Sequence, residues 1–157
     1  MSLDSDIAVL RRVRLFEGFQ QEQLRLLAFG CEARVLAKGT RLFKQGAFSE
    51  GGYVVVHGQV DLFSGARNNF VSTYENGALL GEMALITETE HSTTAVAGED
   101  SEVLKISRPL FRRMLEEYPS LAELLQERIS KSVSEFMVHL ERISVKLDQA
   151  EELAERS

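Results

Sequence analysis

Short apolar runs follow one another through the middle of the chain, and glycines separate them. The runs are rich in Val, Phe and Tyr, and they are Val35–Leu36, Leu42–Phe43, Tyr53–Val56, Val60–Phe63 and Phe70–Tyr74. Residues of these types fit a pleated, half-buried surface, and glycines supply the turns between strands. The pattern therefore predicts the strands of an antiparallel barrel or roll.

The run Tyr53–Val56 is apolar at every position, which predicts a strand that is covered on both of its faces. His57 and Gly58 follow it and separate it from the next apolar run. Because a glycine readily supplies the positive φ of a tight turn, we expect the strands on either side of this pair to form a hairpin.

Apolar residues at helical spacing lie on both sides of the strand region. Near the N-terminus they are Leu24, Leu27 and Ala28, and we expect their helix to pack on the roll. After the strands, Ser107 is suited to cap a helix, with Pro109 in the first turn where its missing N–H is harmless. The predicted core face of this second helix consists of Leu110, Phe111, Met114 and Leu115.

A third predicted helix is unusually long for a globular protein. It begins near Pro119, after the interruption at Tyr118, and neither Gly nor Pro occurs between Ser120 and about Ala154. From residue 129 onward its apolar positions alternate spacings of four and three, which is the pattern of a coiled-coil seam. The seam consists of Ile129, Val133, Phe136, Leu140, Ile143, Leu147, Ala150 and Ala154.

A coiled-coil seam needs a partner helix, because an isolated helix of this kind would expose a long apolar stripe. We therefore expect a homodimer through residues 129–154, with parallel or antiparallel orientation left open. The alternative is that the long helix lies back on its own roll. The predicted domain division is 1–129 for the roll with its flanking helices and 130–157 for the extension of the dimerisation helix.

Composition agrees with a single soluble globular domain. Of the 157 residues, 44% are hydrophobic and 27% are charged, which are ordinary values for a packed protein. No apolar run approaches the roughly 18 residues needed to span a bilayer, and residues 1–6 are not signal-like. The expectation is a cytoplasmic protein with no membrane partner.

The charged and chemically reactive residues argue against several other functions. A formal net charge of −6 is unfavourable for nucleic-acid binding, because duplex binding relies on Lys and Arg to neutralise phosphates. The three histidines, His57, His91 and His139, have no metal-ligand spacing, and none is placed near an obvious Ser or Cys nucleophile. Cys31 is the only cysteine. We therefore predict no nucleic-acid partner, no metal and no enzymatic activity.

The segment from Gly81 to Thr94 carries the most functional information. Gly81 precedes Glu82–Ile86, which is suited to a short helical turn, and a glycine there lets backbone N–H groups approach an anion closely. Glu82 would repel a phosphate unless it accepts hydrogen bonds, for which a sugar hydroxyl is suitable. Farther along, an imidazole and three hydroxyls precede a predicted strand, in His91, Ser92, Thr93 and Thr94. These residue types suit a cyclic phosphate.

The sequence Gly81-Glu82-Met83-Ala84-Leu85, with a polar run nine residues after Glu82, resembles the phosphate-binding cassette of the cyclic-nucleotide-binding domain family. The resemblance extends from about Leu15 to about Ile129. It implies a mainly β fold, namely an antiparallel, jelly-roll-like β-roll with N-terminal helices and a long C-terminal helix.

The resemblance also implies roles for individual residues. Glu82 would accept a hydrogen bond from the ribose 2′-hydroxyl, and the backbone amides of Met83 and Ala84 would meet the cyclic phosphate. In the family, an arginine pairs with the phosphate oxygens, and its position falls by spacing on His91. The following Ser92 and Thr93 would add hydrogen bonds to the phosphate and the base.

Histidine in place of arginine at position 91 is the main departure from the family pattern. Arginine is always charged and presents a planar fork, whereas an imidazole with a reference pKa near 6.5 is mostly neutral at pH 7. The loss of one charge-assisted contact costs about 1.5–3 kcal/mol, which lowers affinity by roughly ten- to a hundredfold or more. A bound phosphate would raise the pKa of His91 and recover part of this loss.

The first hypothesis is therefore a regulatory module without its own effector domain that binds cAMP or cGMP and acts on an effector protein in trans. Its ligand-binding residues are Gly81, Glu82, Met83, Ala84, His91, Ser92 and Thr93. The second hypothesis is a ligand-independent dimerisation or adaptor module that has lost nucleotide binding together with the arginine. A third, that the roll binds another small anion or nucleotide, is equally compatible with these residue types.

Overall fold

The computed structural model of the chain describes residues 3–128. The chain divides into two units between Ala122 and Glu123, and the first of these holds every labelled helix and strand, whereas the helical residues 119–128 extend past the division. The predicted dimerisation segment 129–154 and the division predicted after residue 129 lie outside the described residues. Within the described part, no helix is long and apolar enough to cross a membrane.

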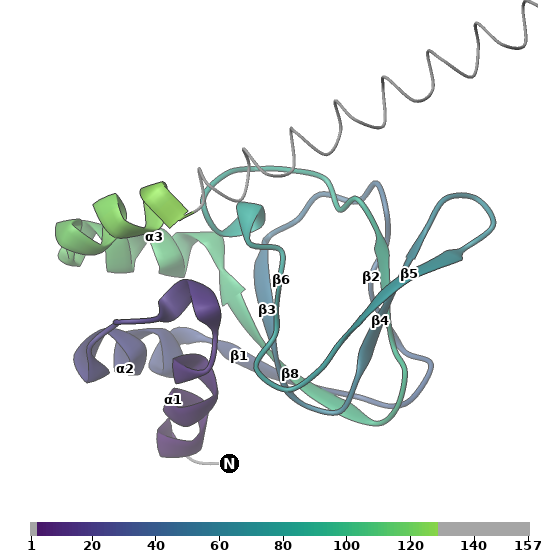
Figure 1. Ribbon diagram of the computed structural model, residues 1–157, viewed down its shortest axis with the longest axis horizontal. Coiled ribbons are helices and arrows are strands. Elements are labelled where there is room, and N and C mark those ends of the chain that lie inside the picture. Colours follow the sequence, from purple (N-terminus) through teal and green to yellow (C-terminus); the bar gives the residue numbers. More distant parts are fainter. Residues whose placement is uncertain (1–2, 129–157) are drawn as a thin grey trace, which may run out of the picture. The chain divides into compact units, whose positions relative to one another are not determined.

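Eight strands form two antiparallel sheets, which confirms the predicted β-roll (Figure 1). The first sheet has the order β1-β8-β3-β6, with β1 Glu32–Leu36, β8 Ser101–Ser107, β3 Gly51–His57 and β6 Leu79–Leu80. The second has the order β2-β7-β4-β5, with β2 Arg41–Phe43, β7 Thr94–Ala97, β4 Val60–Ser64 and β5 Asn69–Tyr74.

The two sheets enclose one apolar core. Alternate residues of each strand point into it, because successive side chains of a strand point to opposite faces. The first sheet supplies Leu36, Tyr53, Val55, Leu80 and Val103, and the second supplies Val60, Leu62, Ala95 and Ala97. Phe43 of β2 is partly buried against this core.

The predicted hairpin around His57 and Gly58 is wrong. β3 pairs with β6 and β8, whereas β4 pairs with β5 and β7, so the two strands belong to different sheets. Gly58 does have the expected positive φ of 92°. A Cβ atom there would lie 2.7 Å from the carbonyl oxygen of Asp100, so the glycine allows the chain to pass tightly between the sheets.

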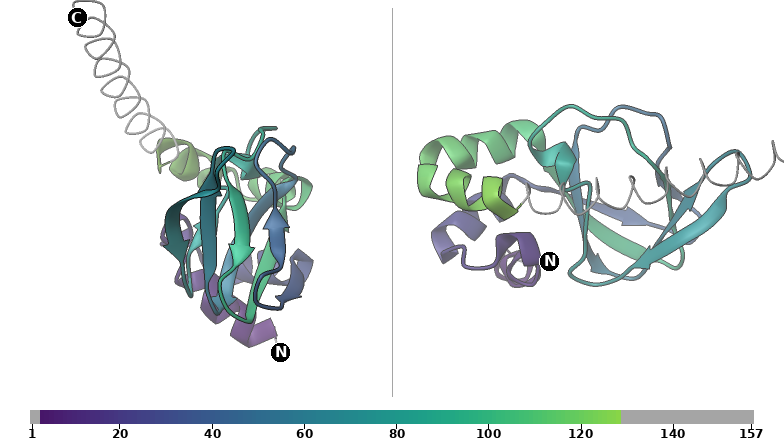
Figure 2. Two further views of the ribbon diagram at one scale, coloured as in Figure 1. Left: turned by 90° about the vertical axis from the view of Figure 1, so that its right-hand side faces the viewer. Right: turned by 45° about the horizontal axis from the view of Figure 1, so that its top comes forward.

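Helices cover the outer face of the first sheet, as Figures 1 and 2 show. They are α1 Leu3–Arg11, the 3-10 helix η1 Arg14–Phe16, α2 Gln21–Gly30 and α3 Arg108–Glu117. Val54, Leu104 and Ile106 point toward this side and are fully buried. The strand predicted to be covered on both faces is therefore confirmed, since Gly51 to Val56 are all buried.

The starts and ends of the helices follow the predicted local signals. Ser107 caps α3, where its hydroxyl oxygen accepts a hydrogen bond from the amide of Leu110, and Pro109 lies in the first turn. α3 ends at Glu117, and Tyr118 is its C-cap. The expected apolar face of α2 is buried, in Leu24, Leu27 and Ala28.

Candidate functional site

The first half of the predicted cassette forms a tight turn directly after β6. Gly81 has a φ of 83°, in the left-handed region that favours glycine, and a Cβ atom there would lie 3.2 Å from the carbonyl oxygen of Gly51. The 3-10 helix η2, Met83–Leu85, follows at once, and the amide of Ala84 donates to the carbonyl of Gly81 at 3.0 Å. The predicted helical turn after a glycine is therefore present.

The residues of this turn differ in exposure. Ala84 and Leu85 are fully buried, whereas the side chain of Met83 is 39% exposed. Glu82 is half-buried at the N-cap of η2. The turn rests on β3, where a Cβ atom at Gly52 would lie 3.1 Å from the Leu85 side chain. The glycine pair that opens β3 thus leaves the space that the turn occupies.

His91, the second predicted anchor, is held by its backbone and by its ring. Its amide donates to the carbonyl of Ala47, and its carbonyl accepts from the amide of Gly46, each at 2.9 Å. Its imidazole stacks on Phe43, with ring centroids 3.8 Å apart and planes inclined by 9°. Phe43 in turn lies 5.8 Å from the ring of Tyr53.

Burial lowers the pKa of His91 below its usual value, because the half-buried ring loses solvation of its charged form. The imidazole is therefore neutral at pH 7 in the absence of ligand. A neutral ring donates at most one hydrogen bond and brings no charge to a phosphate. At pH 7, His91 therefore differs from the arginine of the family pattern both in its charge and in the number of hydrogen bonds that it can donate.

The remaining predicted residues lie at the entrance of β7. Ser92 is exposed and Thr93 is half-buried. The hydroxyl oxygen of Thr94 accepts a hydrogen bond from the amide of Gln45 at 3.0 Å. The polar run is therefore fixed to the loop that follows β2.

Both halves of the cassette attach to one continuous segment, residues 45–52. Gly46 and Ala47 bind His91, the amide and hydroxyl of Ser49 both donate to the carbonyl of Thr89, and Gly51 and Gly52 contact the Gly81–Leu85 turn. No site role is predicted for this segment from the sequence. Its double glycine was the available signal, since adjacent glycines mark places where another part of the backbone approaches closely.

Arg108, the first residue of α3, ties this segment to the cassette and was also missed. Its Nε donates to the carbonyl of Ala84 at 3.0 Å, and its Nη2 donates to the carbonyl of Ser49 at 2.7 Å. Its backbone amide donates to the carbonyl of Glu50 at 2.9 Å. One side chain thus connects the cassette turn, the 45–52 segment and the start of α3. Nothing in the local sequence distinguishes it from neighbouring arginines.

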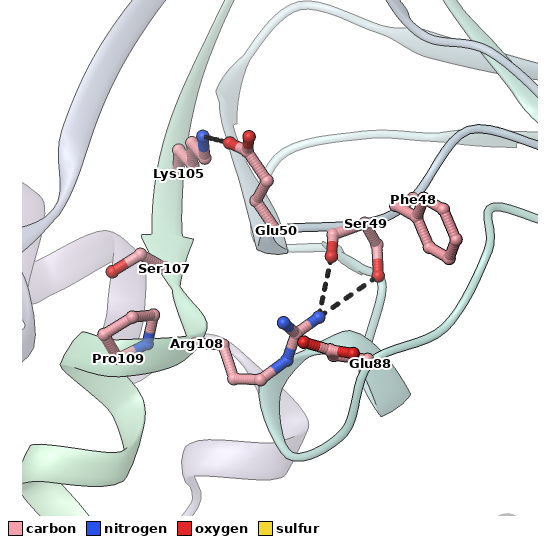
Figure 3. A pocket seen from close by; sticks show the side chains of 8 residues that line it. All are labelled: Phe48, Ser49, Glu50, Glu88, Lys105, Ser107, Arg108 and Pro109. Carbon is pink, nitrogen blue, oxygen red and sulfur yellow. Dashed lines mark hydrogen bonds and ion pairs between the residues drawn. The ribbon is translucent and has the colours of Figure 1, made fainter.

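Two of the cavities formed by residues 3–128 lie near the cassette, and none of the seven predicted residues lines either of them. The larger, of about 560 Å³, is lined by Phe48, Ser49, Glu50, Glu88, Lys105, Ser107, Arg108 and Pro109 (Figure 3). The smaller, of about 450 Å³, is lined by Lys44, Gln45, Gly65, Ala66, Asn68 and Thr94.

Other reactive chemistry is sparse in the described part of the chain. Among residues 3–128, no group of three or more His, Cys, Asp or Glu side chains could hold a metal ion. Burial raises the pKa of the Cys31 thiol to about 11, and its Sγ donates to the carbonyl of Ala28 at 3.2 Å. A protonated, partly buried thiol is a poor nucleophile.

Two sheets face each other, helices cover one outer face, and a glycine-led turn is fixed to the start of β3. Together these features define a β-roll domain. The sequence profile described as cyclic nucleotide-binding domain matches residues 33–118. The chain therefore belongs to the cyclic-nucleotide-binding domain family.

Similar proteins support this assignment. The cyclic AMP receptor protein of Thermus thermophilus is 30% identical over 133 residues, which cover 83% of this chain and 62% of that protein. A cAMP-dependent protein kinase regulatory subunit of Eremothecium gossypii is 31% identical over 119 residues, or 76% of this chain and 26% of that subunit. The chain thus spans less than two thirds of either curated relative.

Solved structures show the same fold. A cyclic nucleotide-binding-like protein from Brucella abortus is 47% identical, with a TM-score of 0.65, and the match covers 72% of this chain and 99% of that one. The N-terminal domain of a transcriptional regulator from Streptomyces coelicolor is 25% identical, with a TM-score of 0.73 over 81% of this chain and 93% of that one.

Proposed function

We propose that this chain is a regulatory module that binds a cyclic nucleotide, cAMP or cGMP, through its cassette. In this proposal the amide of Met83 faces the cyclic phosphate beside Gly81, and Glu82 accepts from the ribose. The amide of Ala84 already donates to the carbonyl of Gly81, so it reaches the phosphate only if that hydrogen bond is shared or opened. His91, Ser92 and Thr93 supply the remaining polar contacts.

The attachment of both cassette halves to residues 45–52 carries this proposal. A cyclic phosphate needs backbone amides on one side and polar side chains on the other, held at a fixed separation. Here the glycine-led turn and the His91 run are anchored to the same short segment, so their spacing is set before the ligand arrives. The two cAMP-named relatives support a nucleotide as the ligand.

The second candidate is a module that keeps the roll as a scaffold and binds its partner without nucleotide. The stacking of His91 on Phe43 favours it, because the ring is occupied and neutral in the absence of ligand. Under this candidate, Glu82→Ala leaves dimerisation and partner binding unchanged. A partner interaction that changes with Glu82→Ala only when nucleotide is present would contradict it.

We also propose that the chain dimerises through residues 129–154 and acts on an effector. The alternating four-three seam of apolar residues supports the dimer.

A bound nucleotide can change the action on an effector only if it binds two conformations of the chain with different affinity. Arg108 offers a physical route for such a change, since it joins the cassette turn to the start of α3.

Isothermal titration calorimetry with cAMP and cGMP at pH 6 and pH 8 tests the proposal. A phosphate favours the protonated imidazole, so binding takes up a proton and affinity rises as the pH falls. Because the pKa of His91 is lowered in the absence of ligand, the rise extends below the reference value of about 6.5. Saturable binding that is tighter at pH 6 supports the nucleotide sensor, whereas flat titrations with millimolar nucleotide at both pH values favour the second candidate.

A further inference from the structure

The 560 Å³ cavity shown in Figure 3 lies beside the cassette but is built by other residues. Its walls come from the Phe48–Glu50 loop, from the end of β8 and from the first residues of α3. Glu88 is its only lining residue from the loop between η2 and β7. Its volume is within the range of pockets that hold small molecules.

The guanidinium of Arg108 gives the cavity a positive charge that forms no ion pair with another described residue. Nε and Nη2 donate to the carbonyls of Ala84 and Ser49, and Nη2 also approaches the Ser49 hydroxyl at 3.5 Å. In Figure 3 no dashed line joins the other terminal nitrogen to any of the residues drawn. No carboxylate among residues 3–128 lies within ion-pairing distance of this side chain. A half-buried cation bound only to carbonyls and a hydroxyl retains a strong preference for an anion.

Two apolar groups lie at opposite edges of the cavity. The ring of Phe48 is 77% exposed, which is unusual for a large aromatic side chain in a globular domain. Pro109 presents its pyrrolidine ring at the other edge. Flat apolar surfaces of this kind bind planar ligand groups by burying area that would otherwise face water.

We propose that this cavity is a second ligand site, for a small molecule with a planar apolar group and one oxyanion, either carboxylate or phosphate. The oxyanion binds the remaining terminal nitrogen of Arg108, and the planar group lies against the ring of Phe48. This site shares no lining residue with the predicted nucleotide contacts.

Two carboxylates restrict which anions the site accepts. Glu50 is paired with Lys105, whose side chain is only 11% exposed, so this carboxylate is already neutralised. Glu88 is exposed and has no such ion pair among the described residues, so it repels an incoming anion. The site therefore favours a single anionic group over a ligand with several.

A two-dimensional amide NMR titration of the whole chain with phenyl phosphate and with benzoate tests the proposal. Saturable shifts at residues 48–50 and 105–110, with a dissociation constant on the order of a few millimolar, are expected for ligands of this size. The tighter of the two probes identifies the preferred oxyanion. Benzyl alcohol, which has the ring without the charge, is expected to bind at least about fivefold more weakly.

Variants at the exposed positions Phe48 and Glu88 test this site without risk to the fold, and a charge-conserving change tests Arg108, which is half-buried. Phe48→Ala is expected to weaken binding about fivefold, whereas the matched change Phe70→Ala, at another exposed aromatic ring, has no effect.

Glu88→Gln is expected to tighten binding about two- to fivefold, and Glu99→Gln is its control. Arg108→Lys, which keeps the charge but loses the fork, is expected to weaken it at least fivefold or so.

Three results would overturn the proposal. One is the absence of saturable shifts with either probe at roughly ten times the expected dissociation constant. Another is equal binding of benzyl alcohol, which would show that the charge of Arg108 plays no part. The third is loss of probe binding in Glu82→Ala with no change in Phe48→Ala, which would place the probe at the nucleotide cassette.

Discussion

An imidazole stands at position 91, where the family pattern implies a guanidinium, and its surroundings are specific. The ring lies flat on Phe43, its backbone is bound on both sides by Gly46 and Ala47, and burial keeps it neutral. A histidine in this setting responds to ligand and pH together, because only its protonated form donates from both nitrogens.

Restoring the guanidinium is therefore informative. His91→Arg is expected to tighten cyclic-nucleotide binding by at least roughly tenfold, since it supplies one charge-assisted, forked contact. A guanidinium also stacks on an aromatic ring, so the contact with Phe43 can be kept. Calorimetry measures the change, with His57→Arg as a control for added positive charge. No gain would mean that contacts to the sugar or base are missing as well.

The same residue predicts a pH dependence of folding. Because the pKa of His91 is lowered in the folded protein, the unfolded chain takes up a proton first as the pH falls below about 6.5. Stability is therefore expected to decrease from that pH down to the lower folded pKa. Thermal unfolding of the wild type is expected to show a steeper decrease over this window than His91→Gln. Parallel curves for the two proteins would show that His91 does not contribute.

For single residues, the sequence predicts a structural role where that role depends on local chemistry. Gly81 and Ser107 are examples, since a left-handed turn and a helix cap each depend on a few neighbouring residues. Phe43 and Arg108 were not found, because their roles depend on partners 48 and 24 residues away, in His91 and Ala84. Residue type alone did not distinguish them.

Among the elements, the β6–η2 turn depends most strictly on its glycine. Gly81→Ala is expected to cost about 1–2 kcal/mol of stability from the left-handed backbone. It should also weaken nucleotide binding, because the Gly51 carbonyl oxygen, 3.2 Å from the new Cβ, and the turn must move apart by a few tenths of an ångström. Gly65→Ala is the matched control, since Gly65 has a φ of 82° and a Cβ there would meet nothing within 4 Å. Thermal unfolding and calorimetry together separate the backbone cost from the effect on the site.

The link between η2 and α3 gives a second prediction for these elements. Arg108→Gln removes two charged hydrogen bonds to backbone carbonyls and is expected to cost about 2 kcal/mol or more. Hydrogen exchange should accelerate in residues 84–90, which these bonds hold. Arg112→Gln, at an exposed position on the same helix, is the control. Unchanged exchange in that segment would show that Arg108 does not hold the cassette turn.

The sequence predicted which helices and strands are present, but it did not predict every strand pairing correctly. The strand runs, the capped helix and its interruption at Tyr118 all match local patterns. The hairpin at Gly58 failed because a glycine turn looks the same whether it joins partners in one sheet or transfers the chain to another. Which sheet a strand enters is decided by the core that the two sheets share.

For the whole molecule, the testable feature is association. Leu140→Asp places a charge at a predicted seam position and is expected to convert a dimer to a monomer in sedimentation equilibrium. Ser144→Asp adds the same charge at a flanking position and should leave the dimer intact. A monomeric wild type would contradict the proposed dimer directly, and two dimeric variants would place the interface elsewhere.

The rings of His91, Phe43 and Tyr53 contact one another in succession, and this packing affects the circular dichroism of the protein. The chain contains no tryptophan, so its near-ultraviolet circular dichroism comes mainly from tyrosine and phenylalanine. Tyr53 is buried and 5.8 Å from Phe43, and such fixed aromatic packing produces a near-ultraviolet signal that mobile rings do not. Any ligand or proton that moves His91 off Phe43 therefore alters this spectrum. The protein carries a label-free reporter of its own candidate site.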